Sequence, residues 1–315
     1  MPSNERNPAI SVVFAATLVS TLGACRSAHR DAVLDADATA ASSARSSREA
    51  GPPAAHEQGD AGPLASGIPV PAAKVEAVMN SEHRPPYAGK TGSVEGTVRI
   101  SGDAPPPSKL EIPPECTDAV AMYGRLFREG PGRTAADVLV AVTEYDGYVP
   151  AGTDSYPISI RGCAFDSRTL ALAYGQRIEI HNDDDNLPYL PALVGANLPA
   201  RFVAIPHGEP VRLYPNEPGH YVLGDTMGRT WMYADVFVVR YATHAVTRLD
   251  GRYALEGIPV GRVKVSAYLP AIGQTVDRQV EVEAGQATRV DFVLPFKVKK
   301  EPKPAASAPA GPTIK

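Results

Sequence analysis

The chain has 315 residues, 43% of them hydrophobic, and a formal net charge of −4 at pH 7. This length allows one large folded domain or two smaller ones. The slightly negative charge argues against a nucleic-acid partner, because nucleic-acid-binding proteins carry a strongly basic surface. The patterns GxSxG, HExxH, GxGxxG and CxxC, which mark hydrolases, metalloproteases, dinucleotide-binding enzymes and redox proteins, do not occur. We therefore expect that the protein is not an enzyme and has no cofactor.

A short polar stretch containing Arg6 is followed by an apolar run from Ile10 to Leu22. The run is too short to span a bilayer, which needs about 20 residues, but it has the length of a secretory signal peptide. It ends in Leu-Gly-Ala-Cys, with Cys25 last, and this sequence resembles the lipobox of bacterial lipoproteins. The resemblance implies cleavage of residues 1–24 and a diacylglyceryl thioether on Cys25. An ordinary cleaved signal peptide with a chance cysteine is the alternative.

Two segments have compositions that are typical of disorder. Residues 25–89 are rich in Ala, Ser, Pro, Gly and Asp, and residues 297–315 are similar, with a basic start. Such segments bury too little apolar surface to offset the entropy lost on folding. We expect a disordered tether, with at most a helical turn near residues 73–79, and a disordered tail. Together with the signal peptide, the tether predicts an exported protein that a lipid anchors to the cell envelope. We place it in the outer membrane facing the periplasm, or at the cell surface.

Cys116 and Cys163 remain as an even pair once Cys25 carries the lipid. Exported proteins fold in an oxidising compartment, where a pair of cysteines forms a disulfide by default. A pair of metal ligands is the alternative, but neither cysteine lies in a CxxC motif or has a histidine nearby. We expect a disulfide between Cys116 and Cys163.

The residues between the tether and the tail form short runs that are rich in β-branched and aromatic residues, and several runs alternate with a period of two. Pro, Gly, Asn and Asp fill the gaps, as in a sandwich or barrel. One short helix is expected at residues 117–127, and no strand–helix alternation indicates a parallel sheet. The predicted fold class is all-β. The expected strands are 94–100, 137–145, 156–160, 176–180, 209–214, 220–224, 234–241, 252–257, 263–269, 278–283 and 288–294.

The run Asn-Asp-Asp-Asp-Asn at residues 182–186 raises the question of a calcium site. It lacks the interleaved spacing, the central glycine and the bidentate glutamate of a calcium-binding loop. Asn and Asp are also the usual residues of turns. We interpret the run as a solvated turn.

A series of motifs between residues 92 and 241 follows an order found in a known family. The series is GSVEGTVRISGDAPPP, Cys116, DVLVAV, GCAF, YGQRIEIHNDD, GHYVLGD and WMYADVFVV. It resembles the methylamine-utilisation or plastocyanin-like branch of the cupredoxins, which implies a cupredoxin-like Greek-key sandwich or barrel over residues 90–241. In that family an NSDPxxHN turn supplies the first copper-binding histidine. A CDxHxWM segment supplies the thiolate, the second histidine and the axial methionine, and two imidazoles with one thiolate form the trigonal copper site.

This sequence departs from the family at the copper ligands. The turn reads NDDDNLPY over residues 182–189, with Pro188 where the histidine belongs. The second segment reads GDTMGRTWM over residues 224–232 and contains neither Cys nor His. Met232 alone stands at a ligand position, and a lone thioether binds copper weakly. We therefore expect that the metal site is lost.

A weak residual site for a soft metal is the alternative. It would use Met227 and Met232 together with His220. Trp231, the single tryptophan of the chain, is expected to pack the end of the fold, because its side chain has a large apolar area.

The segment AVTRLDGRYALEGIPVG at residues 245–261 is similar to the VTxxDGxYxLxGxPxG signature of carboxypeptidase regulatory-like domains. The Asp-Gly pair fits a tight hairpin, because glycine adopts positive φ angles readily. The resemblance implies a small transthyretin-like sandwich over residues 242–296, without catalytic residues. This segment is short for a complete sandwich, and GSVEGTVRI also resembles the opening strand of this family. We therefore expect strand 94–100 to lie beside the 244–295 segment, with the cupredoxin-like part inserted.

The combined expectation is a membrane-anchored envelope lipoprotein that acts as a non-catalytic binding or structural module. Its partners would be the membrane, through the lipid anchor, and an envelope protein or polysaccharide of unknown identity. Two alternatives stay open: a metal-binding or electron-transfer cupredoxin with an atypical site, and a carbohydrate-binding module. A carbohydrate-binding module would need exposed aromatic side chains on one face. The candidates for that face are Tyr145, Tyr148, Tyr156 and Tyr189.

Overall fold

The computed structural model describes residues 66–298 of the chain. The predicted signal peptide, Cys25, most of the predicted tether and nearly all of the predicted tail lie outside the described residues. All of the described residues belong to one compact unit. None of the helices within residues 66–298 is long and apolar enough to cross a membrane.

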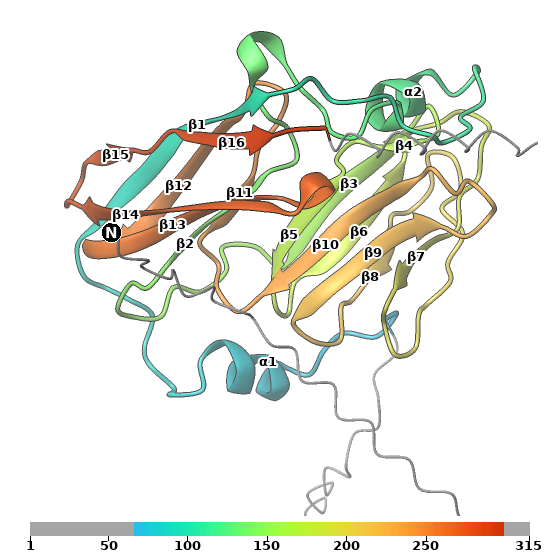
Figure 1. The fold of residues 1–315 in the computed structure, drawn as a ribbon. Coiled ribbons are helices and arrows are strands. Elements are labelled where there is room, and N and C mark those ends of the chain that lie inside the picture. Colours follow the sequence, from blue (N-terminus) through green and yellow to red (C-terminus); the bar gives the residue numbers. More distant parts are fainter. Residues whose placement is uncertain (1–65, 299–315) are drawn as a thin grey trace, which may run out of the picture. The chain divides into compact units, whose positions relative to one another are not determined.

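Residues 66–298 fold into two β-sandwiches, which confirms the predicted all-β class (Figure 1). We call the first the terminal sandwich, because its strands come from both ends of the described chain. One of its sheets has the order β12-β1-β15, with β16 also paired to β1, and the other has the order β11-β2-β13-β14. Its strands are β1 (Thr91–Gly102), β2 (Leu139–Thr143), β11 (His244–Val246), β12 (Arg252–Pro259), β13 (Gly261–Leu269), β14 (Gln274–Val282), β15 (Ala287–Arg289) and β16 (Phe292–Phe296).

Strand β1 lies inside its sheet and joins the two ends of the described chain. It pairs antiparallel with β12 and parallel with β15 and β16. The prediction that strand 94–100 shares a sheet with the C-terminal segment is therefore confirmed. Gly96 permits this close approach, because a Cβ there would lie 1.9 Å from the carbonyl oxygen of Val290, between β15 and β16. Beside it, the N–H of Thr97 donates to the Asp291 carboxylate at 2.8 Å rather than to a strand carbonyl.

The second sandwich, which we call the inserted sandwich, lies between β2 and β11 in the sequence. Its sheets have the orders β5-β10-β9-β7 and β4-β3-β6-β8. Along β6, Ile178 and Ile180 are fully buried while His181 is only half-buried on the opposite face, because successive side chains of a strand alternate. Its strands are β3 (Ser155–Arg161), β4 (Ala164–Phe165), β5 (Thr169–Ala173), β6 (Arg177–Asn182), β7 (Pro191–Val194), β8 (Val211–Leu213), β9 (Gly219–Asp225) and β10 (Tyr233–Val239).

The border between the sandwiches differs from the one expected from the sequence. The sequence assigns residues 90–241 to the cupredoxin-like part, but β1 and β2 belong to the terminal sandwich, where β2 pairs with β11 and β13. All four residues from Leu139 to Val142 are buried. One face of β2, with Val140 and Val142, belongs to the core of the terminal sandwich, and β2 also contacts β5 of the inserted sandwich. A strand buried on both faces is a continuous apolar run, and such a run does not indicate which sheet it joins.

Helix α1 (Ala72–Met79) lies within the stretch that the sequence assigns to the tether. Its side chains Val75, Val78 and Met79 pack against the core of the inserted sandwich. The folded part therefore begins before residue 89, and the tether is shorter than expected. The polar composition of residues 25–89 hides this helix, because the helix contributes only three large apolar side chains to the core.

Helix α2 (Thr117–Tyr123) begins directly after Cys116, as expected, but it ends before Phe127. Phe127 is fully buried in the core of the terminal sandwich, where its ring meets that of Phe296 edge to face at 5.0 Å. Because α2 ends at Tyr123, the Phe127 ring reaches the core of the terminal sandwich and is not part of the helix. Two short 3-10 helices span Pro131–Arg133 and Pro270–Ile272.

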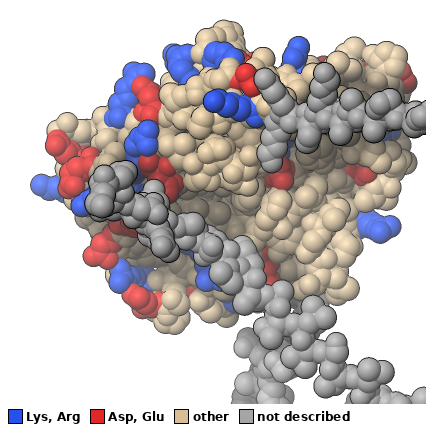
Figure 2. Space-filling model, in the orientation of Figure 1, with Lys and Arg blue, Asp and Glu red and all other residues tan. Residues whose placement is uncertain are grey.

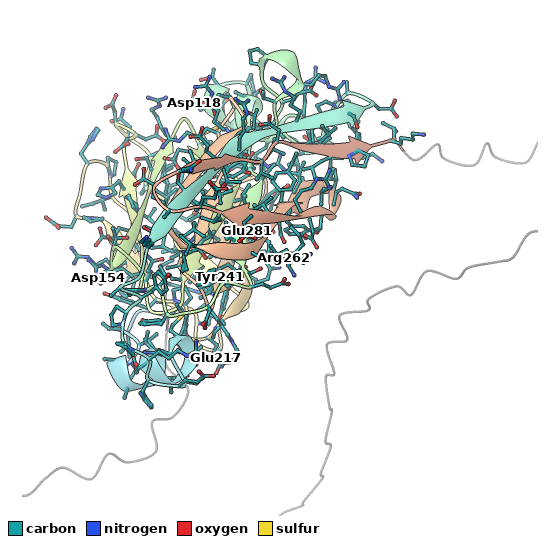
Figure 3. All side chains as sticks on the ribbon, turned by 90° about the vertical axis from the view of Figure 1, so that its left-hand side faces the viewer. Asp118, Asp154, Glu217, Tyr241, Arg262 and Glu281 are labelled. Carbon is teal, nitrogen blue, oxygen red and sulfur yellow. A yellow bond between two sulfur atoms is a disulfide. The ribbon has the colours of Figure 1, made fainter. Side chains whose placement is uncertain are left out.

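Charged side chains are dense over the terminal sandwich, on the left of Figure 2, and sparse over β8 and β9 on the right. Within the terminal sandwich, opposite charges face one another across the strands. Arg262 on β13 lies opposite Glu281 on β14 (Figure 3), and Lys264 Nζ lies 2.7 Å from Glu144 Oε1. Such exposed pairs add little stability, so this surface is a solvated one.

Contacts between the sandwiches include one made by His244 and one made by Phe237. The Nε2 atom of His244 on β11 lies 3.0 Å from the carbonyl oxygen of Ala171 on β5, and its Nδ1 atom lies 3.1 Å from the carbonyl oxygen of Tyr241. The ring of Phe237 on β10 meets that of Tyr268 on β13 edge to face at 5.7 Å. The outer faces of two sheets are therefore packed against each other, which explains why strands of both are buried on two sides.

Candidate functional site

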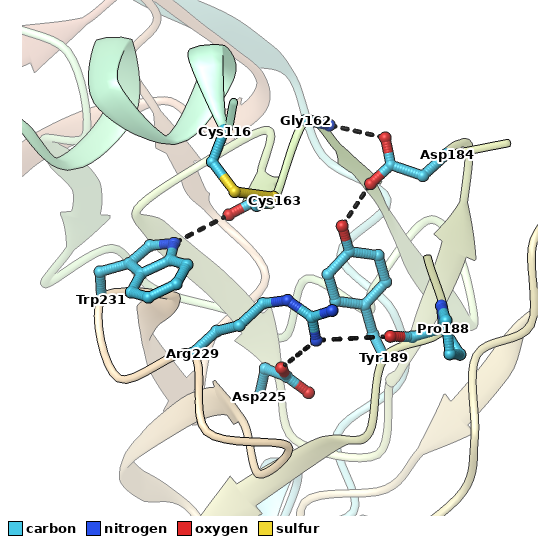
Figure 4. Close-up of a disulfide and its surroundings, with 9 residues drawn as sticks. All are labelled: Cys116, Gly162, Cys163, Asp184, Pro188, Tyr189, Asp225, Arg229 and Trp231. Atoms are coloured by element: carbon cyan, nitrogen blue, oxygen red, sulfur yellow. Dashed lines mark hydrogen bonds and ion pairs between the residues drawn. A yellow bond between two sulfur atoms is a disulfide. The ribbon is translucent and has the colours of Figure 1, made fainter. Parts of the chain in front are cut away.

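A disulfide joins Cys116 and Cys163, as predicted, with their Cα atoms 5.3 Å apart. Cys116 directly precedes α2, and Cys163 lies between β3 and β4. Both residues are buried. The bond fixes α2 to one end of the inserted sandwich, which we call the disulfide end (Figure 4).

The two segments that the sequence analysis compared with copper-ligand segments meet at the disulfide end. These are the turn at residues 182–189 and the segment at residues 224–232. The N–H of Leu190 donates to Asp225 Oδ1 at 2.8 Å, and the N–H of Thr226 donates to the Leu190 carbonyl at 3.0 Å. The fold therefore brings together the two stretches that the motif order predicts to be neighbours.

Arg229 links the two segments (Figure 4). Its Nη1 atom lies 2.8 Å from Asp225 Oδ2 and 3.4 Å from the carbonyl oxygen of Pro188. Its guanidinium carbon lies 4.5 Å from the centre of the Tyr189 ring, within cation–π range. The Asp225 side chain is fully buried, and the Arg229 side chain is 18% exposed. The positively charged guanidinium group of Arg229 therefore stands beside Pro188.

Sequence reasoning missed Arg229 and Asp225 as a pair. They are four residues apart in GDTMGRTWM, where the family motif directs attention to metal ligands alone. A signal was available, because this segment has no Cys or His to bind copper but does contain one acidic residue, Asp225, and one basic residue, Arg229. Opposite charges in a buried stretch are expected to pair with each other.

Tyr189 and Asp184 tie the turn to the disulfide. The hydroxyl group of the fully buried Tyr189 donates to one carboxylate oxygen of Asp184. The other oxygen of Asp184 accepts the N–H of Gly162, next to Cys163, at 2.8 Å. Burial raises the pKa of Tyr189 well above its usual value, and the neighbouring Asp184 charge raises it further. The phenol therefore stays protonated and acts as a hydrogen-bond donor.

The interpretation of residues 182–186 as a solvated turn holds only in part, because Asn182 ends β6 and is buried, and the chain leaves the strand after it. The Asn182 side-chain oxygen accepts the N–H of Asp184 at 3.1 Å, which is a short local turn bond. Asp185 reaches His207, whose Nε2 atom lies 3.1 Å from Asp185 Oδ1. Among residues 66–298, no group of three or more His, Cys, Asp or Glu side chains is placed to hold a metal ion.

The structure does not bring Met227, Met232 and His220 together. Met232 is buried in the core of the inserted sandwich, whereas Met227 is half exposed in the turn after β9. His220 lies near the start of β9, where its ring stacks on Phe237 at 4.7 Å and its Nε2 atom lies 2.7 Å from Asp235 Oδ1. Because a strand rises about 3.3 Å per residue, the length of β9 keeps this imidazole on the order of 15 Å from the turn that carries the methionines.

Trp231 packs at the disulfide end, as expected. Its ring is half-buried against the core of the inserted sandwich and against the cluster around the disulfide. The indole N–H donates to the carbonyl oxygen of Cys163 at 3.3 Å. The indole therefore lies beside the disulfide and reports on its surroundings.

The four tyrosines considered for carbohydrate binding do not share one exposed face. Tyr189 is fully buried in the inserted sandwich, and Tyr156 packs against the same core. Tyr145 packs against the core of the terminal sandwich and bonds through its hydroxyl group to Thr243 at 3.2 Å. The backbone of Tyr148 forms a bridge to Pro86.

A cavity of about 640 Å³ opens beside α2. Two of the arginines that line the cavity have acidic partners. Arg161 Nε lies 3.0 Å from an Asp118 carboxylate oxygen. Arg128 donates two hydrogen bonds, of 2.7 and 2.5 Å, to the buried Asp137 carboxylate. The cavity therefore presents no strong excess of one charge to a ligand. Its lining combines both signs of charge with apolar side chains: Asp118, Ala121, Met122, Arg125, Phe127, Arg128, Glu129, Ser159, Arg161, Ala164, Phe165, Asp166, Asp183 and Leu249.

Residues 222–295 match the family model of the carboxypeptidase regulatory-like domain. The match extends from β9 to β16 and includes the segment in which the sequence analysis found the family signature. It covers less than half of the chain. No curated protein matches the chain.

Solved cupredoxin structures are similar to part of the chain. A reduced amicyanin mutant, with tyrosine in place of a tryptophan, is 15% identical, with a TM-score of 0.25, over 28% of this chain and 86% of that one. Amicyanin from Paracoccus versutus is 19% identical, with a TM-score of 0.25, over 29% of this chain and 85% of that one. A copper-containing nitrite reductase from Thermus scotoductus is 20% identical, with a TM-score of 0.24, over 31% of this chain and 24% of that one. At these TM-scores the similarity establishes neither a ligand nor a partner for this chain.

Proposed function

We propose that this protein is an exported lipoprotein whose two sandwiches form a non-catalytic binding or structural module. A diacylglyceryl group on Cys25 would anchor it to the cell envelope, in the outer membrane facing the periplasm or at the cell surface. The lipobox-like sequence before Cys25 supports the anchor. The disulfide supports export, because disulfides persist in oxidising compartments. Its partner would be an envelope protein or polysaccharide.

The position of Arg229 is the observation that carries the non-catalytic part of this proposal. A blue-copper site needs two imidazoles and one thiolate. At the disulfide end, Cys116 and Cys163 are bonded to each other, and Pro188 offers only a backbone carbonyl. The guanidinium group of Arg229 adds a positive charge, which repels a metal cation. These residues do not fit copper, and we propose no electron transfer through them.

The same residues fit a structural role. Arg229 is held by Asp225, Pro188 and Tyr189, and Tyr189 is held in turn by Asp184. These bonds fix two loops to each other and to the disulfide without a metal ion. Loops that are ordered before binding lose less entropy when a partner arrives, so this end is suited to present a rigid surface.

The lipid anchor is tested by the intact mass of the protein purified from envelopes of a diderm bacterial host. The expected mass is that of the chain from Cys25 onward plus a diacylglyceryl group, with or without one further acyl chain. Cys25→Ser should lose this added mass and the membrane association. The matched control, Cys116→Ser with Cys163→Ser, should keep the added lipid mass. An unmodified Cys25 thiol in the wild type, or a Cys25→Ser variant that still sediments with membranes, would contradict the proposal.

A further inference from the structure

Exposed apolar side chains gather at one place on the inserted sandwich. Between residues 187 and 206 the chain has a single charged residue, Arg201. Seven large apolar side chains in this stretch or beside it in the fold are each between 39% and 57% exposed, and one of them, Val194, lies at the end of β7. We call the other six the apolar surface: Ile68, Leu187, Leu198, Phe202, Val203 and Ile205.

Contacts of the two residues that precede Ile68 place this segment beside Leu198 and Phe202. The N–H of Ser66 donates to the carbonyl oxygen of Leu198 at 2.8 Å, and the Ser66 hydroxyl accepts the N–H of Ala200 at 2.5 Å. Next to Ser66, a Cβ on Gly67 would lie 2.9 Å from the ring of Phe202. The first described residues of the chain are therefore fixed against the loop that follows β7.

The remaining members adjoin this loop through Asn182 and Ala204. The Asn182 amide donates to the carbonyl oxygens of Leu187 and Ala204, both at 2.8 Å. Ala204 is buried and pairs with Tyr189. Because side chains alternate along an extended chain, Val203 and Ile205 on either side of Ala204 point outward together. These contacts bring the segments that carry the six side chains next to one another.

We propose that the apolar surface docks onto the lipid bilayer that carries the anchor. This inference rests on the proposed lipidation of Cys25. Ser66, the described residue nearest to Cys25 in the sequence, is bonded to the loop that carries this surface, so the described part of the chain begins beside the apolar surface. Contiguous exposed apolar patches mark protein or membrane contact sites.

The length of the connecting chain makes such docking effective. Forty residues lie between Cys25 and Ser66, and a chain of that length reaches about 140 Å at most. An anchored protein therefore meets the bilayer at high effective concentration, so a contact that is weak in free solution becomes well populated.

The chemistry of the apolar surface favours lipid over a protein partner. Five of its six members are aliphatic, whereas protein interfaces are enriched in aromatic residues, Met and Arg. The one charge within the stretch is the exposed Arg201, which would meet lipid phosphates. Charged side chains are also sparse over the neighbouring β8 and β9 (Figure 2).

Fluorescence of a tryptophan placed on the apolar surface tests the docking. The chain has one tryptophan, so Trp231→Phe gives a background without Trp emission. Phe202→Trp in this background places the probe on the apolar surface. Val293→Trp is the matched control, because Val293 is also half exposed but lies on β16 of the terminal sandwich. Both lipidated full-length proteins are incorporated into phosphatidylethanolamine–phosphatidylglycerol vesicles, with and without bromine on the upper acyl carbons.

Docked apolar groups lie about 5–10 Å into the headgroup and acyl boundary, so bromine should reduce emission from Trp at position 202 roughly twofold or more. Emission from position 293 should not change. Equal quenching at both positions, or none at either in protein of confirmed lipidated mass, would overturn the docking and leave the anchor in place. If the mass shows no lipid, the anchor fails, and the same probes in Cys25→Ser protein test the surface separately.

Two further outcomes are distinguishable. A blue shift at position 202 that appears in native envelopes but not in protein-free vesicles would show a protein partner and overturn the bilayer proposal. If the Trp231→Phe background does not fold, both probes can be read with Trp231 retained. Its emission is then common to the pair, and the difference between positions 202 and 293 still decides the question.

Discussion

Arg229 Nη1 lies 2.8 Å from Asp225 Oδ2, and the Asp225 side chain is fully buried. The pair connects the segment after β9 to the turn at residues 182–189, since Asp225 also accepts the N–H of Leu190. Two loops that are about 40 residues apart in the sequence are therefore held together around a buried ion pair.

Arg229→Met should destabilise the protein by about 3–5 kcal/mol, because it leaves the buried Asp225 charge without its partner. The matched control is Arg161→Met, which removes a pair with Asp118 whose side chains are 75% and 45% exposed. That change should cost less than about 1 kcal/mol. Urea unfolding of the two variants measures the difference. Equal costs would show that the Arg229–Asp225 pair is no more important than a surface pair.

Reduction of the Cys116–Cys163 disulfide should destabilise the protein by roughly 3–4 kcal/mol, the loop-entropy value for a separation of 47 residues. Trp231 emission should change on reduction, because the indole donates to the carbonyl oxygen of Cys163. Urea unfolding followed by fluorescence, with and without reductant, gives both readings. Two free thiols in denatured, unreduced Cys25→Ser protein would show that the bond does not form.

His244 should make the stability depend on pH. Burial lowers the pKa of His244 below its usual value of 6.5, while its bonds to the Tyr241 and Ala171 carbonyls oppose the shift. The unfolded chain therefore binds the proton at a higher pH than the folded chain does. This contribution to stability is complete above about pH 6.5 and is lost as the pH falls through the folded pKa.

The measurement is the melting temperature between about pH 7.5 and pH 5, where the wild type should lose stability as the pH falls. His244→Gln should weaken this dependence, and His83→Gln, at an exposed position, should leave it unchanged. If the profile of His244→Gln matched that of the wild type, His244 would not be the group responsible.

Gly96→Ala should destabilise the terminal sandwich by about 1–3 kcal/mol or more, the usual cost of forcing an atom into a packed site. The new Cβ would lie 1.9 Å from the Val290 carbonyl oxygen. Gly152→Ala is the control, because no atom lies within 4 Å of its added Cβ. Thermal unfolding compares the two variants, and a Gly96→Ala protein as stable as the control would disprove the close contact of β1 with β15 and β16.

The sequence predicts the features that depend on local pattern. Alternation in β6 and the even cysteine pair are examples, and the family signature places the C-terminal strands. It does not predict the sandwich to which β2 belongs, because the LVAV run is buried on both faces and has no alternation. It also does not predict that Arg229 faces Asp225, since that contact depends on how the turn after β9 folds over Pro188.

Copper binding tests most directly the claim that the inserted sandwich works without a metal. Full-length Cys25→Ser protein, with its disulfide intact, is mixed with one equivalent of Cu²⁺, and absorption and melting temperature are recorded. We predict no intense band at about 600 nm, the sign of a copper–thiolate bond, and no gain in melting temperature. An intense blue band, or near-stoichiometric copper retained after dialysis against a mild chelator, would contradict the account.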